Sequence, residues 1–134
     1  MSQQNIDYSI IKQVSIGYSE TIEKLTEALA EQGFGILTSI DIATTLQKKL
    51  NVDYPRTIIL GACNPPIAHK ALTAVPDIAV LLPCNIVVRE NKQGEVEIVA
   101  MNPLLMSHLI DNPEVHTIAI EADKRIRAAI DNVV

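Results

Sequence analysis

Two short apolar segments joined by a polar turn constrain the fold of this chain most. Residues 86–88 are Ile-Val-Val, and within 96–100 apolar residues alternate with other side chains. Between these segments lies Asn-Lys-Gln-Gly at 91–94, a composition that is typical of a turn. The pattern predicts an antiparallel hairpin that spans residues 85–100.

The remainder of the chain switches between the apolar period of strands and that of helices. Period-two alternation or a continuous apolar run predicts three further strands, at 6–16, 34–40 and 56–63. Helical spacing of apolar residues predicts five helices, at 19–33, 42–50, 65–75, 103–110 and 113–133. Residues 77–83 fit either a helical turn or an extended segment.

Several residues predict where the helices begin and end. Ser19, Asp41 and Asn64 have the short polar side chains that cap helix N-termini. Pro65 suits the first helical position, and Gly33 suits a helix C-terminus. These signals define the first three helices.

A hairpin that is followed by two helices favours an α+β fold. We therefore expect a mostly antiparallel sheet of about five strands, with helices packed on one face. The chain has 134 residues, which suits a single domain that spans residues 1–134. No internal repeat or linker divides it.

The charge balance argues against nucleic-acid binding. The net charge is −5, from 11 basic and 16 acidic residues. Lys124, Arg125 and Arg127 form the densest basic group, but on a helix they point in different directions. Binding to phosphates requires clustered cations, so no nucleic-acid partner is expected.

Nothing in the sequence indicates export or a membrane. Residues 1–5 are polar and do not resemble a signal peptide, and the apolar stretch at 78–82 is too short to span a bilayer. Two cysteines in a chain without an export signal are expected to be reduced thiols. We therefore expect a cytoplasmic protein with no membrane partner.

The common catalytic and nucleotide-binding motifs are absent. The sequence contains no GxGxxG, no P-loop, no GxSxG, no HExxH and no CxxC. His108 and His116 are separated by Asn112-Pro113, so they do not form one helical ligand pair. We assign no catalytic residue and no cofactor, and an enzymatic role is not favoured.

The strongest candidate site lies where the strand at 56–63 meets the next helix. Cys63 precedes the helix N-terminus, where free N–H groups and the helix dipole favour a thiolate. Cys84 begins a later strand, so its sulfur would lie near that of Cys63 if the two strands are neighbours. His69 lies off the apolar stripe of the helix, within two turns of Cys63.

These residues support three functional hypotheses, of which the first is favoured and the other two are alternatives. In the first, a small or anionic ligand binds at this junction, held by the helix N-terminus and by the side chains at five positions: Cys63, Asn64, Pro65, Cys84 and Asn85. In the second, a soft metal ion binds to Cys63, Cys84 and His69, or the two cysteines act as a redox pair. In the third, the chain is an interaction domain without a small-molecule site. Both cysteines also fit simple apolar packing.

At these residues the sequence resembles the prokaryotic family called domain of unknown function 302, from about Tyr8 to Ala128. The features that carry the resemblance are Leu25 with Gly33-Phe34, Cys63-Asn64-Pro65 with Ala68 and Leu72, Pro76, Leu-Leu-Pro-Cys-Asn-Ile-Val-Val at 81–88, Gly94 and Asn102-Pro103.

The resemblance implies a curved antiparallel sheet with helices on one face, similar to the TATA-binding-protein fold. It implies no function, because the family is uncharacterised. It also leads us to expect a homodimer, with the contact supplied by the last helix or by an exposed sheet edge.

Overall fold

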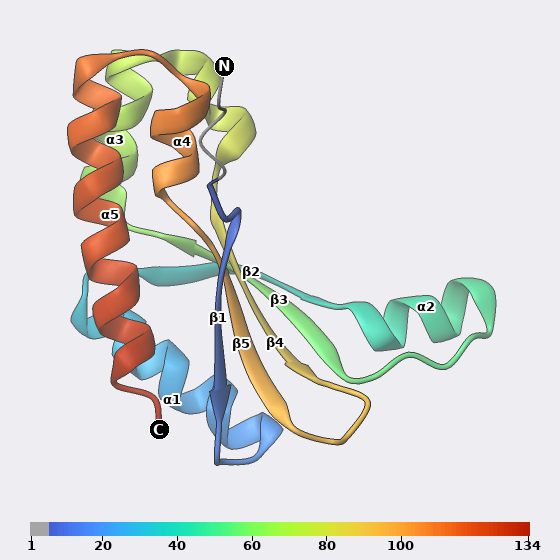
Figure 1. The fold of residues 1–134 in the computed structure, drawn as a ribbon. Helices are drawn as coiled ribbons and strands as arrows, with labels where there is room; N and C mark the ends of the chain where they lie inside the picture. The colour runs from blue at the N-terminus through green and yellow to red at the C-terminus, as the bar shows by residue number, and fades with distance from the viewer. Residues whose placement is uncertain (1–5) are drawn as a thin grey trace, which may run out of the picture.

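The computed structural model describes residues 6–134, and its centre is one five-stranded antiparallel sheet (Figure 1). The strands are β1 (Ser9–Val14), β2 (Gly35–Asp41), β3 (Thr57–Cys63), β4 (Cys84–Glu90) and β5 (Val96–Met101). They lie in the order β1-β5-β4-β3-β2, and each neighbouring pair is antiparallel. The predicted hairpin, β4 with β5, and the α+β fold class are confirmed. Residues 1–5, which carried the prediction about export, lie outside the described part.

Five α-helices and one 3₁₀ helix accompany the sheet. They are α1 (Tyr18–Glu31), α2 (Ile42–Leu50), α3 (Pro65–Ala74), the 3₁₀ helix η1 (Pro76–Leu81), α4 (Leu104–Leu109) and α5 (Pro113–Asp131). Figure 1 shows α1 and α5 on one face of the sheet, with α3 and α4 beside the N-terminal half of α5. In the same view α2 projects on the opposite side of the sheet, beyond β2 and β3. The ambiguous segment at 77–83 is therefore helical for most of its length.

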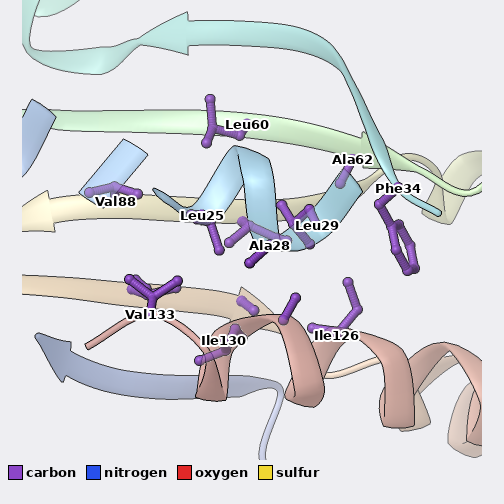
Figure 2. Close-up of a cluster of buried hydrophobic side chains, with 14 of the residues drawn as sticks. Leu25, Ala28, Leu29, Phe34, Leu60, Ala62, Val88, Ile126, Ile130 and Val133 are labelled. Atoms are coloured by element: carbon purple, nitrogen blue, oxygen red, sulfur yellow. The ribbon is translucent and has the colours of Figure 1, made fainter. Parts of the chain in front are cut away.

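The main core fills the layer between the sheet and the helices α1 and α5 (Figure 2). Alternate residues of each strand point into this layer, as period two requires. Its fully buried side chains include Leu25, Leu29, Ile86, Val88, Ile98 and Ile126. A second cluster joins α3, η1, α4 and α5 through Ile67, Ala71, Ile78, Met106, Val115 and Ile118. Together these clusters bury most of the apolar stripe of α5.

The helix boundaries follow the predicted caps with one exception. Asp41 accepts a hydrogen bond from the Thr44 N–H at 2.9 Å, as an N-cap does. The prediction of Ser19 as the first cap is wrong, because α1 already begins at Tyr18 and its N-cap is Gly17. Gly17 has the extended backbone of a cap, so the chain turns into the helix two residues before Ser19.

Candidate functional site

The structure brings the two cysteines together at one end of the sheet. Strands β3 and β4 are neighbours, and Ala62 pairs with Cys84, so Cys63 follows directly on the adjacent strand. Cys63 and Cys84 are both free thiols, and both line the same small cavity. The remaining walls are mostly apolar and come from Phe34, Ala62, Ile67, Leu82, Pro83, Met106, Ile118 and Ala122, among others.

The size of this cavity limits what it can hold. Its volume is about 20 Å³, which is enough for roughly one water molecule. Pockets for small organic ligands are usually about 300 to 1,000 Å³. In this conformation the junction is therefore a packed end of the core rather than a ligand pocket.

Both the oxygen and the nitrogen of the Asn64 side-chain amide form hydrogen bonds within the chain. Its Oδ1 accepts from the Ile67 N–H at 3.2 Å, and its Nδ2 donates to the Gln32 carbonyl at 3.2 Å. The side chain is buried and joins the start of α3 to the end of α1. These two bonds explain why an asparagine occupies this position without any ligand.

The N-terminus of α3 has no donors left for an anion. Pro65 and Pro66 lack N–H groups, the Ile67 N–H is bonded to the Asn64 side chain, and the Ala68 N–H donates to the Asn64 carbonyl at 2.8 Å. The geometry therefore gives no support to the predicted anion site at this terminus. Two consecutive prolines and a capping side chain satisfy the first turn completely.

Three predicted site residues lie away from the cysteine cavity. Asn85 is exposed on β4, one residue after buried Cys84, so its side chain points to the opposite face of the sheet. Pro65 is exposed at the start of α3. His69 lines a separate, open groove between α3 and α5. Within residues 6–134 no three His, Cys, Asp or Glu side chains gather as a possible metal site, so His69 does not join the two cysteines.

Burial governs the chemistry of the Cys84 thiol. Removal from water, and to a smaller extent the nearby Cys63, raises the pKa of Cys84 to about 11. The thiolate is the form that attacks electrophiles and binds metals. Cys84 is therefore a neutral thiol at physiological pH, which suits packing better than redox or metal chemistry.

An open groove lies between α3 and α5 beside this junction. Its volume is about 600 Å³, and its walls carry His69 and Lys70 from α3 with Glu114 and Glu121 from α5. Near its end Glu121 accepts from Arg125 at 3.3 Å. The charged groups are exposed at the surface, and among the described residues no buried side-chain polar atom lacks a partner. The groove thus has no buried group that would select a ligand.

A serine, a histidine and an aspartate meet at the turn between α4 and α5. Ser107 Oγ forms a hydrogen bond with His116 Nδ1, and Asp111 Oδ1 lies 3.6 Å from His116 Nε2. These are the residue types of a hydrolase triad. However, Asp111 is fully exposed, and none of the cavities described above includes the three residues. Ser107 belongs to α4 and His116 to α5, so their hydrogen bond links the two helices. Sequence analysis missed this cluster because a helix–turn–helix separates Ser107 from His116.

The uncovered face of the sheet carries an apolar row that crosses all five strands. The strand register pairs Ile11 with Val99, Val99 with Val87, Val87 with Ile59, and Ile59 with Ile40. These five residues, here called the open-face row, share the side of the sheet opposite to the buried core positions. The end residues are the most open, with Ile11 56% and Ile40 48% exposed.

Polar residues border the open-face row on one side. The adjacent cross-strand row is Gln13, Glu97, Arg89 and Thr57, in which Arg89 forms an ion pair with Glu97 at 3.0 Å. An antiparallel sheet that faces water on one side usually alternates apolar residues inward with polar residues outward. The polar row follows that rule and the open-face row breaks it.

Comparison with models of protein families shows which family the chain belongs to. The model of the family described as domain of unknown function DUF302 matches residues 10–133. The chain belongs to the DUF302 family. An uncharacterised protein of Aquifex aeolicus (strain VF5) is 29% identical to the DUF302 chain over 121 residues, which cover 88% of this chain and 78% of the relative.

A solved structure supports the DUF302 fold directly. The crystal structure of an uncharacterised conserved DUF302 protein from Bacillus stearothermophilus superposes with a TM-score of 0.88 at 31% identity, covering 95% of this chain and 98% of that one. The predicted family resemblance is confirmed. Neither relative has an assigned activity. In residues 6–134 of this DUF302 chain, no helix combines the length and the apolar character needed to cross a membrane.

Proposed function

We propose that this DUF302 chain works as a self-associating interaction domain that buries its open-face row against a second copy. The observation that carries the proposal is the unbroken register of Ile11, Val99, Val87, Ile59 and Ile40 across the uncovered face. The row is contiguous, with exposed ends and a half-buried centre, and a contiguous apolar surface is typical of a protein–protein contact.

The energetics of apolar burial support this choice. Covering a valine or isoleucine side chain stabilises an assembly by about 1.5 to 3 kcal/mol at most. The three central residues are already half buried by their neighbours, whereas Ile11 and Ile40 keep about half of their surface exposed. A row of β-branched side chains also suits sheet-on-sheet packing, in which the faces of two sheets meet.

The other two hypotheses have less support from the geometry. The cavity at Cys63 and Cys84 holds about 20 Å³, and the donors at the start of α3 are already bonded. Homodimer contact through α5 is also less favoured, because its apolar stripe is packed inside the chain. The open-face row has neither restriction.

Sedimentation equilibrium of the purified chain tests the proposal. We expect the natural sequence to be dimeric at micromolar concentration and Val99→Lys to be monomeric, since it places a charge in the centre of the row. Gln13→Lys is the matched control, because it adds the same charge to the same face within the polar row and should remain dimeric. A monomeric natural chain, or a dimeric Val99→Lys with unchanged affinity, would refute the proposal.

A further inference from the structure

The groove between α3 and α5 is formed by one face of each helix. Figure 1 shows α3 beside the N-terminal half of α5, and the two helices pack on one another through the second core cluster. Within each helix every lining residue lies three or four positions from another, a spacing that places them on one face. The lining residues are His69, Lys70 and Thr73 from α3, and Pro113, Glu114, Thr117, Ile118 and Glu121 from α5.

The two walls of the groove carry opposite charges. The α3 wall presents the Lys70 ammonium, and the α5 wall presents the carboxylates of Glu114 and Glu121. Arg125 binds the Glu121 carboxylate at 3.3 Å and offsets its charge. In residues 6–134 neither Lys70 nor Glu114 takes part in an ion pair. One cation and one anion therefore line the same groove without a charged partner from the described part of the chain.

The rest of the lining between these charges is apolar or accepts hydrogen bonds. Ile118 is only 6% exposed and forms the floor. Thr73 donates its hydroxyl proton to the His69 carbonyl at 2.8 Å, and Thr117 donates to the Pro113 carbonyl at 3.3 Å. Both hydroxyl protons are used within their own helices, so each threonine offers the groove an acceptor oxygen.

We infer that this groove binds a short zwitterionic peptide, with its ammonium at Glu114 and its carboxylate at Lys70. No buried group selects the ligand, so selection rests on the two charged walls. A ligand with only negative charge would be repelled by Glu114, and one with only positive charge by Lys70. The groove shares no residue with the open-face row, so the inference does not depend on the proposed self-association.

The dimensions of the groove suit a dipeptide. Its volume of about 600 Å³ falls in the range of roughly 300 to 1,000 Å³ that is usual for small-molecule pockets. Packed helices lie about 8 to 10 Å apart between their axes. Two extended residues span about 7 Å, so the two ends of a dipeptide can meet side chains from both helices. L-Alanyl-L-alanine is therefore the probe.

Nuclear magnetic resonance titration of the full chain with L-alanyl-L-alanine tests the inference. We expect saturable shifts of the backbone amides of α3 and α5 that line the groove, with a dissociation constant on the order of 1 mM for so small a ligand. The N-acetylated dipeptide lacks the ammonium, and the C-terminal amide lacks the carboxylate. Each should bind about fivefold more weakly, the loss expected for one exposed ion pair.

Variants assign each charge of the peptide to its wall. Glu114→Gln and Lys70→Met should each weaken binding of the dipeptide about fivefold. In Glu114→Gln, N-acetylation of the peptide should cause no further loss, whereas in Lys70→Met it should cause the full loss. Lys124→Met, on α5 outside the groove, and Glu27→Gln, on α1, are the matched controls and should bind as the natural chain does. All four side chains are exposed, so the variants should keep the fold.

Three results would overturn the inference. The first is the absence of saturable shifts up to about 20 mM dipeptide, twentyfold above the expected dissociation constant. The second is equal affinity for the free, acetylated and amidated peptides, which would mean that the end charges are not recognised. The third is an equal loss of affinity in Lys124→Met and Lys70→Met, which would point to the overall charge of the chain rather than to the groove.

Discussion

Gly33 and Gly61 illustrate how single residues shape the sheet end that holds the two cysteines. Gly33 ends α1 with φ of +84°, and a Cβ there would lie 2.9 Å from Asn64 Nδ2. A Cβ on Gly61 would lie 2.1 Å from Thr38 Oγ1 and 2.8 Å from Pro83 Cγ. Both positions exclude a side chain, because the neighbouring groups already occupy the space that it would need.

The buried Cys84 thiol predicts a loss of stability at alkaline pH. In the unfolded chain this thiol ionises near its ordinary pKa of 9.0, whereas burial keeps it neutral in the folded chain up to about 11. Its contribution is complete below pH 9 and is lost as the pH rises through about 11. The free energy of unfolding should therefore fall over this interval, by on the order of 2 kcal/mol from this group.

Urea denaturation at several pH values between about 8 and 11 measures this effect. Other groups also titrate in that range, so the quantity to compare is the pH-dependent difference between the natural chain and Cys84→Ala. We expect the fall in stability to be smaller in Cys84→Ala. Equal pH profiles for the two proteins would show that the thiol does not ionise on unfolding as its burial requires.

At the scale of secondary-structure elements, Lys12 joins the first strand to the last helix. It interrupts the apolar alternation of β1 yet lies on the core side, in register with Ile98. Its Nζ donates to the carbonyls of Ile130 at 3.2 Å and Val133 at 2.5 Å, where α5 ends. The ammonium thus satisfies carbonyls that the helix cannot bond and lies at the negative end of the helix dipole.

Removing this ammonium should weaken the fold. Lys12→Met keeps the aliphatic length but leaves the carbonyls at the end of α5 without their donor. We expect the free energy of unfolding to decrease by about 1 to 3 kcal/mol, as for other hydrogen bonds to charged groups. Chemical denaturation checks this value, with Lys24→Met on the exposed side of α1 as control. An equal loss in both variants would rule out the specific role of Lys12.

At the scale of the whole molecule, the structure is asymmetric across its sheet. Helices α1 and α5 cover one face, and the other face presents the open-face row, with α2 projecting beyond the sheet edge. The buried face is packed within one chain, and the cavity beside the cysteines measures about 20 Å³. The uncovered face therefore remains as the surface through which a second copy is proposed to bind.

If a second copy covers this face, stability must depend on protein concentration. Association of folded chains shifts the unfolding equilibrium by mass action, so the melting temperature should rise with concentration. Differential scanning calorimetry over a hundredfold range should show this rise for the natural chain and for Gln13→Lys. A concentration-independent melting temperature for Val99→Lys is the matching expectation, and the same independence in the natural chain would contradict dimerisation.

Much of the fold was predictable because it depends on neighbours within a few residues. The hairpin, the strand and helix order, and the caps Asp41 and Asn64 follow from side-chain period and local hydrogen bonding. The error at Ser19 arose because several residues in that turn have cap-forming chemistry, and the path of the chain out of β1 selects Gly17. Of the predicted site residues, only Cys63, Cys84 and Asn64 line the small cavity that the structure shows.

The sequence by itself determined the local elements, the scarcity of clustered positive charge and the apolar stripe of α2, since each depends on residue type and spacing. The tertiary structure alone decided which strands are neighbours, and through that register it placed Ile11 and Ile40 in one row. It also decided that α2 would project beyond the sheet edge with Leu50 exposed. The physical reason is that pairing between distant segments depends on the free energy of the whole packed chain, which no local pattern contains.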